Sequence, residues 1–372
     1  MRILIDLTYI IPYNYSGVTN YAFRLLEGFK QCLIRNDLIL LCTSLNEPFI
    51  RENAEEYKYI LFNPKMIKKI PHLTGILNQR RLDTIIKREG CELFFSPFLS
   101  YGSLYCHSVP FVGVLHDAQG FSLKSNFLKQ KAFDYSMQYL LSHLTKMVTI
   151  SNFAKKNIKQ VLPSFNIPIE VIYNSISLKN RNSSIASFIK TPYILNVNTL
   201  EPYKNLISLV RAFNLLKNQI PHQLIVKAKR LPYWDNEILP FLINHRIEKR
   251  VRLIDENLTE EKMSTLYSNA SLFVSPSLME GFGFTPIEAA IHGVPVICTK
   301  ESALFETTKG LLNYYAPPTS EEALSIKILE VLSKSYSNEL LSKIAIEYAT
   351  YYSPQKQAEQ FVNLFNRCII HD

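Results

Sequence analysis

The sequence has few glycines and no long apolar run. Only 11 of its 372 residues are glycine. Its longest apolar stretches, such as residues 38–42, fall far short of the roughly 18 residues that a membrane-spanning helix needs. Residues 1–13 carry Asp6 within their apolar stretch and lack the small residues of a cleavage site, which argues against a signal peptide. We therefore expect no spanning segment and a cytoplasmic protein.

Patterns that mark metal sites and common nucleotide sites are also missing. The six cysteines include no C-x-x-C pair, and no two aspartates stand two residues apart. The cysteines therefore predict reduced thiols rather than zinc ligands or disulfides, and a metal-held diphosphate is not expected. The pair Gly281-x-Gly283 is followed by Pro286 where a dinucleotide fingerprint has its third glycine, and no phosphate-loop motif occurs. The cysteines are Cys32, Cys42, Cys91, Cys106, Cys298 and Cys368.

Basic residues exceed acidic ones, and the excess is concentrated in residues 65–88. The formal net charge is +9, and this segment contains a single acid, Asp83. Such a cluster attracts an anionic membrane surface, although a solvated helix face is the simpler alternative. No nucleic-acid-binding signature accompanies the charge, so nucleic acid is not the expected partner. The basic residues of the segment are Lys65, Lys68, Lys69, Arg80, Arg81, Lys87 and Arg88.

Short β-rich runs alternate with longer amphipathic segments along the chain, which predicts an α/β fold with parallel sheets. Helices are expected at 20–34 and 128–144, and the polar segment 174–192 is the best linker candidate. A length of 372 residues favours two domains. The strands are expected at 2–7, 38–43, 93–97, 111–117 and 147–151 before the linker, and at 193–198, 223–229, 251–255, 271–276 and 294–298 after it.

Residues 275–298 hold three of the few glycines and two glutamates, Glu280 and Glu288. A strand ends near Pro276, a glycine-bearing loop follows, and a helix then begins, so free backbone N–H groups and the helix dipole can receive a phosphate. Glu280 has no local structural task at a strand end, which indicates a ligand-binding role over that of a surface turn acid. Thr285 is expected to cap the helix, with Pro286 in its first turn and Glu288 in a capping box.

Residues 275–297 closely resemble the signature of the retaining group 1 glycosyltransferases, in which two glutamates separated by seven residues flank a glycine loop. Other segments resemble further family motifs in the right order, so that the likeness covers nearly the whole chain. These segments are 16–26 (the first glycine loop), 114–121 (an H-D segment), 149–158, 171–177 and 194–205, where E-P-Y-K-N stands for the family's E-P-R-K-N.

The resemblance implies a GT-B architecture, in which two Rossmann-like, doubly wound domains face a cleft. It implies an acceptor-binding domain at 1–178, a donor-binding domain at 190–352, and a C-terminal helix at 353–372 that packs toward the first domain. It also implies transfer of a sugar from a nucleotide-sugar donor to a glycan or lipid-linked acceptor, with retention of configuration and without a metal or other cofactor. The E-P-x-K-N residues weakly favour mannose from GDP-mannose, in the synthesis of lipopolysaccharide O-antigen.

By the same resemblance, three residues take catalytic roles: Glu280 binds donor hydroxyls, Lys204 neutralises the diphosphate, and His116 faces the donor sugar. Glu288 binds the ribose or only caps its helix. The alternative is a solvated surface or loop lysine for Lys204 and Lys229, a satisfied polar residue for His116, and an ordinary turn for Gly17. The donor-binding set comprises Gly17, Asn198, Lys204, Lys229, Glu280, Gly281, Phe282, Gly283, Phe284, Thr285 and Glu288.

Two family positions differ here: the loop glycine is Asn198, and the arginine of E-P-R-K-N is Tyr203. Asparagine tolerates left-handed backbone, so the turn can survive. These differences leave open a catalytically silent homologue that acts as a binding subunit. A sugar-nucleotide epimerase or phosphorylase of the same shape is a further alternative, against which the group 1 motif argues.

Overall fold

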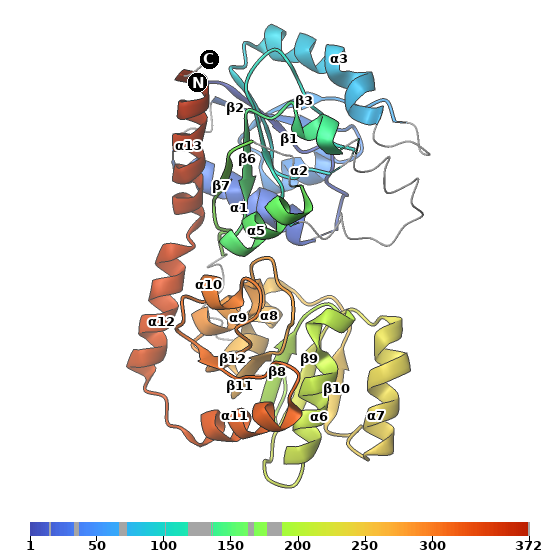
Figure 1. Cartoon of the computed structure of the whole chain (residues 1–372), viewed down its shortest axis with the longest axis vertical. Coiled ribbons are helices and arrows are strands. Elements are labelled where there is room, and N and C mark those ends of the chain that lie inside the picture. Colours follow the sequence, from blue (N-terminus) through green and yellow to red (C-terminus); the bar gives the residue numbers. More distant parts are fainter. Residues whose placement is uncertain are drawn as a thin grey trace. The chain divides into compact units, whose positions relative to one another are not determined.

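The computed structural model divides the chain into two compact units (Figure 1). Unit 1 comprises Met1–Ser177 and Tyr352–Asp372, and unit 2 comprises Leu178–Tyr351. The sequence places the corresponding limits at 1–178, 190–352 and 353–372. The structure describes residues 1–14, 16–32, 37–66, 73–100, 102–117, 135, 137–162, 167–176 and 188–370.

Unit 1 is built on a seven-stranded parallel sheet with the order β3-β2-β1-β4-β5-β6-β7. Nearly all residues of the central strands are fully buried, as expected where helices cover both faces of a sheet. The strands are β1 (Ile3–Asp6), β2 (Leu38–Cys42), β3 (Lys58–Leu61), β4 (Leu93–Ser96), β5 (Phe111–Val114), β6 (Lys146–Thr149) and β7 (Ile169–Val171). The helices are α1 (Gly17–Gln31), α2 (Glu47–Asn53), α3 (Thr74–Glu89), α5 (Asn152–Val161) and α13 (Pro354–Ile370).

Unit 2 repeats this plan with a six-stranded parallel sheet of order β10-β9-β8-β11-β12-β13. In both sheets the first strand lies centrally and the chain then extends outward on either side, which is the doubly wound arrangement predicted from the sequence. The strands are β8 (Tyr193–Val197), β9 (Gln223–Lys227), β10 (Val251–Ile254), β11 (Leu272–Ser275), β12 (Val296–Cys298) and β13 (Asn313–Tyr314). The helices are α6 (Leu206–Leu216), α7 (Leu239–Asn244), α8 (Glu260–Ser268), α9 (Phe284–Ile291), α10 (Leu304–Thr307), α11 (Glu321–Ser333) and α12 (Asn338–Tyr351).

The ten predicted strands are confirmed, and three further strands were not expected. These three, β3, β7 and β13, each lie at the edge of a sheet. Edge strands are short and half exposed, so they lack the continuous apolar run that reveals a buried strand; β3 for example has a single buried residue, Ile60. Residues 128–134 and 136 of the helix expected at 128–144, and residues 177–187 of the expected linker, lie outside the described residues.

The last helix, α13, packs on α1 and β4 of unit 1. The rings of Phe361 and Phe365 lie 5.1 and 5.0 Å from that of Phe95 on β4. On α1, a Cβ added at Gly28 would lie 2.1 Å from the carbonyl oxygen of Pro354, so only glycine permits so close an approach. Unit 1 is therefore completed by residues that follow unit 2 along the chain.

All six cysteines are free thiols. Within the described ranges, no helix combines the length and the apolar character needed to span a bilayer.

Candidate functional site

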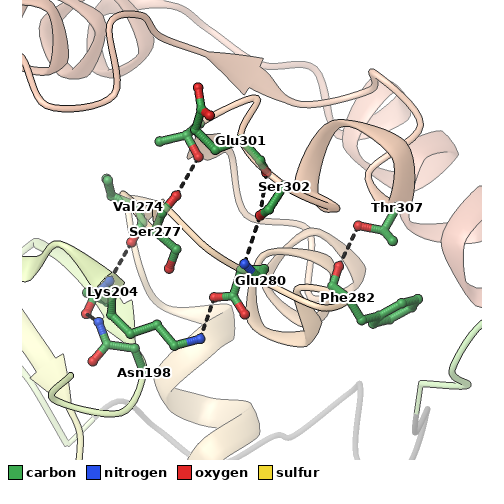
Figure 2. A network of polar contacts seen from close by, with 11 residues as sticks. Asn198, Lys204, Val274, Ser277, Glu280, Phe282, Glu301, Ser302 and Thr307 are labelled. Atoms are coloured by element: carbon green, nitrogen blue, oxygen red, sulfur yellow. Dashed lines mark hydrogen bonds and ion pairs between the residues drawn. The ribbon is translucent and has the colours of Figure 1, made fainter. Parts of the chain in front are cut away.

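The central strands of unit 2, β8 and β11, end in the two loops that carry Lys204 and Glu280. The chain leaves these neighbouring strands in opposite directions, and ligands of doubly wound sheets bind outside the carboxyl ends of strands at such a point. Lys204 Nζ lies 2.8 Å from Glu280 Oε1, and both side chains are 14% exposed (Figure 2). The structure thus joins two of the three predicted catalytic residues in one ion pair.

The loop that carries Lys204 is held in place by Asn205. This residue adopts a left-handed backbone conformation, with φ of 56°, between the short 3₁₀ turn Pro202–Lys204 and α6. Its side-chain amide donates hydrogen bonds to the carbonyl oxygens of Pro276 and Pro318, at 3.1 and 3.0 Å. Asparagine is one of the few residues that accept this conformation readily, and its amide ties the loop after β8 to the loop after β11.

The glycine loop leads into α9, but the predicted capping arrangement is wrong. The helix begins at Phe284, and the residue before it is Gly283 with φ of 86°, a conformation suited to glycine. Thr285 lies inside the first turn, and the N-cap residue is Gly283, which has no side chain with which to cap the helix. Glu288 is therefore two residues too far along the helix for a capping box. Instead its carboxylate accepts a hydrogen bond of 3.0 Å from the hydroxyl of Tyr267.

Two other predicted donor residues lie beside the same edge of the sheet. Asn198 directly follows β8, and its side-chain amide donates to Asn196 at 2.6 Å. Within the part of the chain that the structure describes, the side-chain oxygen of Asn198 is buried without a hydrogen-bond partner, so it can receive a donor group from a ligand. Lys229 lies just beyond β9 with an exposed side chain, and it is not part of the Lys204–Glu280 ion pair.

In unit 1, His116 follows β5 at the carboxyl edge of the sheet. Its Nε2 lies 3.0 Å from the carbonyl oxygen of Pro97, so Nε2 carries the proton and donates it. Burial lowers the pKa of His116 below its ordinary value of 6.5. A neutral imidazole then leaves Nδ1 as a hydrogen-bond acceptor. The ring of Tyr21 on α1 meets the imidazole edge to face, with centroids 4.5 Å apart.

Sequence reasoning missed three polar groups of unit 1: Tyr21, which contacts His116, and Asp6 and Tyr9 at and just after the end of β1. Asp6, the last residue of β1, is 2% exposed and accepts hydrogen bonds from the backbone and hydroxyl of Thr8. Burial raises the pKa of its carboxyl group and, together with the charge of Asp6, that of Tyr9. Among described residues, the hydroxyls of Tyr9 and Tyr21 are buried and have no hydrogen-bond partner. In unit 2, the site residues follow the carboxyl ends of strands. A search for polar residues at the strand ends of unit 1 would have found Asp6 in the same way.

Gly17 is the first residue of α1, directly after its N-cap Ser16. No atom lies within 4 Å of the position that a Cβ would occupy, so the space beside this glycine is open. Gly17 and His116 belong to unit 1, whereas the other predicted site residues belong to unit 2. Among the described residues, no three histidine, cysteine or acidic side chains gather as metal ligands would.

Two parallel, doubly wound sheets of nearly the same strand order define the GT-B class of fold, and solved structures agree. The chain aligns over its full length with sucrose-phosphate synthase from Thermosynechococcus elongatus (TM-score 0.73, 16% identity, 100% of both chains). It aligns as well with Anabaena Alr3699/HepE in complex with UDP (TM-score 0.73, 14% identity, 99% and 100% of the chains).

Family comparisons specify the class further. Residues 180–349 match the family described as "Glycosyl transferases group 1", and residues 15–180 match "Glycosyltransferase Family 4". Both units therefore match glycosyltransferase family models, and the match of unit 2 is to the group 1 family that the sequence motifs predicted. It is similar to O-antigen chain mannosyltransferase B of Escherichia coli (30% identity) and to O-antigen chain mannosyltransferase RfbU of Salmonella typhimurium (26%). These matches cover 46% and 62% of this chain, and 45% and 65% of the relatives' own length.

Proposed function

We propose that the protein transfers mannose from GDP-mannose to a glycan or lipid-linked acceptor in O-antigen synthesis, with retention of configuration and without a metal. The observation that carries the proposal is the Lys204–Glu280 pair at the carboxyl ends of β8 and β11. The names of the two mannosyltransferase relatives support the choice of sugar and of product.

The two members of the pair suit the two parts of a nucleotide-sugar. Lys204 offers a cation to the diphosphate, whose charge grows as the bond between the sugar and phosphate breaks. Glu280 can accept hydrogen bonds from sugar hydroxyls. Both groups are mostly buried, so each keeps the other neutralised until a donor supplies new partners. Binding therefore exchanges one ion pair for contacts with phosphate and sugar.

The remaining donor contacts come from neighbouring elements. The backbone of Gly281 to Thr285 and the start of α9 offer N–H groups to the diphosphate. Glu288, already held by Tyr267, accepts hydrogen bonds from the ribose hydroxyls. Lys229 contributes a second cation. These roles are hypotheses that variants of each residue can test.

In the proposed reaction, an acceptor hydroxyl attacks the anomeric carbon from the side of the departing diphosphate. The carbon–oxygen bond to the phosphate breaks while the new glycosidic bond forms, and the phosphate oxygen takes the acceptor's proton. No nucleophile from the protein is required. Within unit 1, His116 offers its Nδ1 as a hydrogen-bond acceptor suited to a sugar hydroxyl, and Gly17 leaves open space beside α1.

The helix α3 offers a surface suited to an anionic membrane. This surface favours a lipid-linked acceptor over a soluble one. Its exposed side chains include Ile76 (49%) and Leu77 (41%), with Arg80 and Lys87 four and eleven residues after Ile76, on the same helix face. By contrast, Arg81 donates to Asn78 within unit 1. Lys68 and Lys69 of the predicted basic cluster lie outside the described residues. An apolar and basic helix face is suited to peripheral contact with anionic lipid.

A donor screen tests the proposed reaction. GDP-mannose, UDP-glucose, dTDP-rhamnose and ADP-glucose are each added, and thermal stabilisation and slow hydrolysis are measured. We expect GDP-mannose to raise the melting temperature and to be hydrolysed. If a different donor alone stabilises the protein and is hydrolysed by it, that donor replaces GDP-mannose in the assignment. Conversion of a donor to its epimer would indicate an epimerase. No response to any donor would favour a silent binding subunit.

A vesicle experiment tests the membrane contact separately. The protein is sedimented with phosphatidylcholine vesicles that contain phosphatidylglycerol, and the Arg80→Gln/Lys87→Gln double variant is compared with Lys249→Gln, which alters an exposed lysine of unit 2. We expect only the double variant to sediment less. Equal sedimentation of all three proteins would exclude the proposed contact.

A further inference from the structure

The segment that follows β12 places three hydroxyl groups against the loop that carries Glu280. Thr299 Oγ1 donates to the carbonyl oxygen of Ser277 at 2.7 Å, and Thr307 Oγ1 donates to that of Phe282 at 2.5 Å. Between them, Ser302 Oγ accepts a hydrogen bond of 2.8 Å from the backbone N–H of Glu280 (Figure 2). The three hydroxyls thus hold the loop before, at and after the glutamate.

The peptide groups of Glu280 are bound on both sides by this segment. Its N–H donates to Ser302, and its carbonyl oxygen accepts a hydrogen bond of 3.2 Å from the backbone N–H of Ala303. The side chain is left to meet Lys204. Fixing the backbone on both sides of Cα restricts where the carboxylate can lie, and a displacement of about 1 Å at a reacting group can lower a rate about a hundredfold.

Ser302 adopts a backbone conformation that disfavours most side chains. Its φ is 55°, which costs an L-residue roughly 1–2 kcal/mol relative to glycine. A glycine would fit this turn without strain but would lack the hydroxyl. The hydroxyl is itself oriented, because it donates 2.7 Å to the carbonyl oxygen of Glu301 and so directs a lone pair toward Glu280.

Helix α10 also packs closely against the loop that carries Glu280. A Cβ added at Gly283 would lie 2.5 Å from Leu304 Cδ2. Thr307 is fully buried, and its hydroxyl oxygen also lies 2.9 Å from the carbonyl oxygen of Ala303, the N-cap residue of α10. Leu304 and Thr307 therefore fix the loop at its glycine and at Phe282, while Ser302 fixes it at Glu280.

We propose that Ser302 is a positioning residue, assisted by Thr307, that holds Glu280 where its carboxylate meets both Lys204 and the donor sugar. The inference rests on the proposed function, since it takes Glu280 as a contact of the donor. It assigns the segment after β12 a part in the chemistry, although none of its side chains need touch the substrate.

Three substitutions at Ser302 separate the hydroxyl from the backbone strain. Ser302→Ala loses the hydroxyl and keeps the strain, Ser302→Gly loses both, and Ser302→Asn keeps a polar side chain in a residue that tolerates left-handed backbone. At the second position, Thr307→Val removes the hydroxyl with little change of shape, and Thr307→Ser is its matched control. The readouts are kcat for GDP-mannose hydrolysis, Kd for GDP, and melting temperature.

We expect the alanine and glycine variants to lose kcat about tenfold, which corresponds to one hydrogen bond of about 1.4 kcal/mol. Their Kd for GDP should stay within about twofold of the original, because the loop's N–H groups and Lys204 remain. Ser302→Gly should melt at a higher temperature than Ser302→Ala because it relieves the strain. Ser302→Asn should recover part of kcat, and Thr307→Ser should be more active than Thr307→Val.

A glycine variant with unchanged kcat would overturn the proposal, as would a parallel loss of GDP affinity and kcat in every variant. Hydrogen exchange of the Glu280 amide provides a readout that does not depend on turnover and should accelerate in both Ser302→Ala and Ser302→Gly. If the unaltered protein hydrolyses no nucleotide-sugar, the proposed function fails, whereas unchanged amide exchange in these variants refutes the anchor itself.

Discussion

The carboxyl edges of the two sheets are built alike, but their polar groups differ in whether they have partners. In unit 2, the loops after β8 and β11 bring Lys204 and Glu280 together, so each charge already has a partner. In unit 1, Asp6 ends β1, Tyr9 lies in the loop after it, and His116 follows β5 and contacts Tyr21; in the part of the chain described, the hydroxyls of Tyr9 and Tyr21 have no partner. One edge holds a pair of opposite charges, and the other holds a carboxylate bound by Thr8 together with two phenol hydroxyls that have no partner among the described residues.

Electrostatics explains this difference. An unpaired charge that is mostly buried costs several kcal/mol, whereas an unpaired neutral hydroxyl costs only about 1–3 kcal/mol. In the proposed diphosphate site of unit 2, Lys204 and Glu280 neutralise each other while the site is empty, which lowers the cost of burying them. Unit 1 can leave its hydroxyls free at a tolerable cost. Substitutions at either edge and a change of pH test this contrast.

Replacing Glu280 by glutamine should abolish most transfer and retain nucleotide binding. The carboxylate is lost while its shape remains, and removal of one such electrostatic contact lowers kcat by about 10²–10³-fold. The measurement is the rate of GDP-mannose hydrolysis together with Kd for GDP. Glu301→Gln, an exposed glutamate in the segment that anchors the loop, is the control and should be fully active. Full activity of the Glu280 variant would remove Glu280 from the site.

Replacing Lys204 by methionine should weaken binding of GDP by about tenfold or more, since the diphosphate loses its principal cation. It should also lower the melting temperature of the empty protein, because Glu280 loses its partner. Calorimetric titration with GDP and thermal denaturation measure the two effects. Lys249→Met, at an exposed lysine of the same unit, should change neither. Unaltered GDP affinity would place the diphosphate elsewhere.

Removing a phenol hydroxyl in unit 1 should lower stability at one tyrosine and not at another. Tyr57 donates a hydrogen bond of 2.5 Å to the carbonyl oxygen of Leu26, so Tyr57→Phe should lower stability by about 1 kcal/mol. Tyr21→Phe should leave the melting temperature equal or slightly higher, because its hydroxyl is buried without a partner. Differential scanning calorimetry distinguishes the two. A clear loss of stability in Tyr21→Phe would show that its hydroxyl is already satisfied.

The smallest effect should be a loss of stability below about pH 6.5 that depends on His116. Burial lowers the pKa of this imidazole in the folded protein, so between its folded pKa and 6.5 the unfolded chain binds more protons. Its contribution is therefore fully present above pH 6.5 and decreases as pH falls through that window.

Melting temperatures at pH 7.5 and 5.5 measure the dependence. His116→Gln should show a smaller decrease, but not none, because burial also lowers the pKa values of His143 and His222. Asp6 acts in the opposite direction: burial raises its pKa in the folded protein, so its contribution to stability increases as pH falls from that raised pKa to the ordinary value of 3.8. An identical decrease in the variant would show that His116 does not govern this part of the profile.

Much of this arrangement could be predicted from the sequence because buried strands and the glycine loop have strong local patterns. The apolar runs of the central strands gave the two sheets, and the motif residues Lys204 and Glu280 lie together as a shared site requires. Edge strands such as Asn313–Tyr314 were missed because pairing with a neighbour, and not an apolar run, makes them strands.

Other features depend on contacts that no local pattern reveals. The start of α9 was misplaced because Gly283 takes a left-handed conformation, which moves Glu288 out of capping distance and toward Tyr267. Ser302 gave no signal at all, since serine is uncommon at positive φ and its partner Glu280 lies 22 residues away. The roles of such residues follow from the tertiary fold alone.

The return of α13 to unit 1 has a consequence for the order in which the protein is made. Domains usually fold during synthesis as they emerge, the first one first. Here the surface that α1 and β4 present to Phe361 and Phe365 stays uncovered until all of unit 2 has been translated. We therefore expect unit 2 to be the first unit completed on the ribosome, with the exposed apolar surface of unit 1 available to chaperones in the interval.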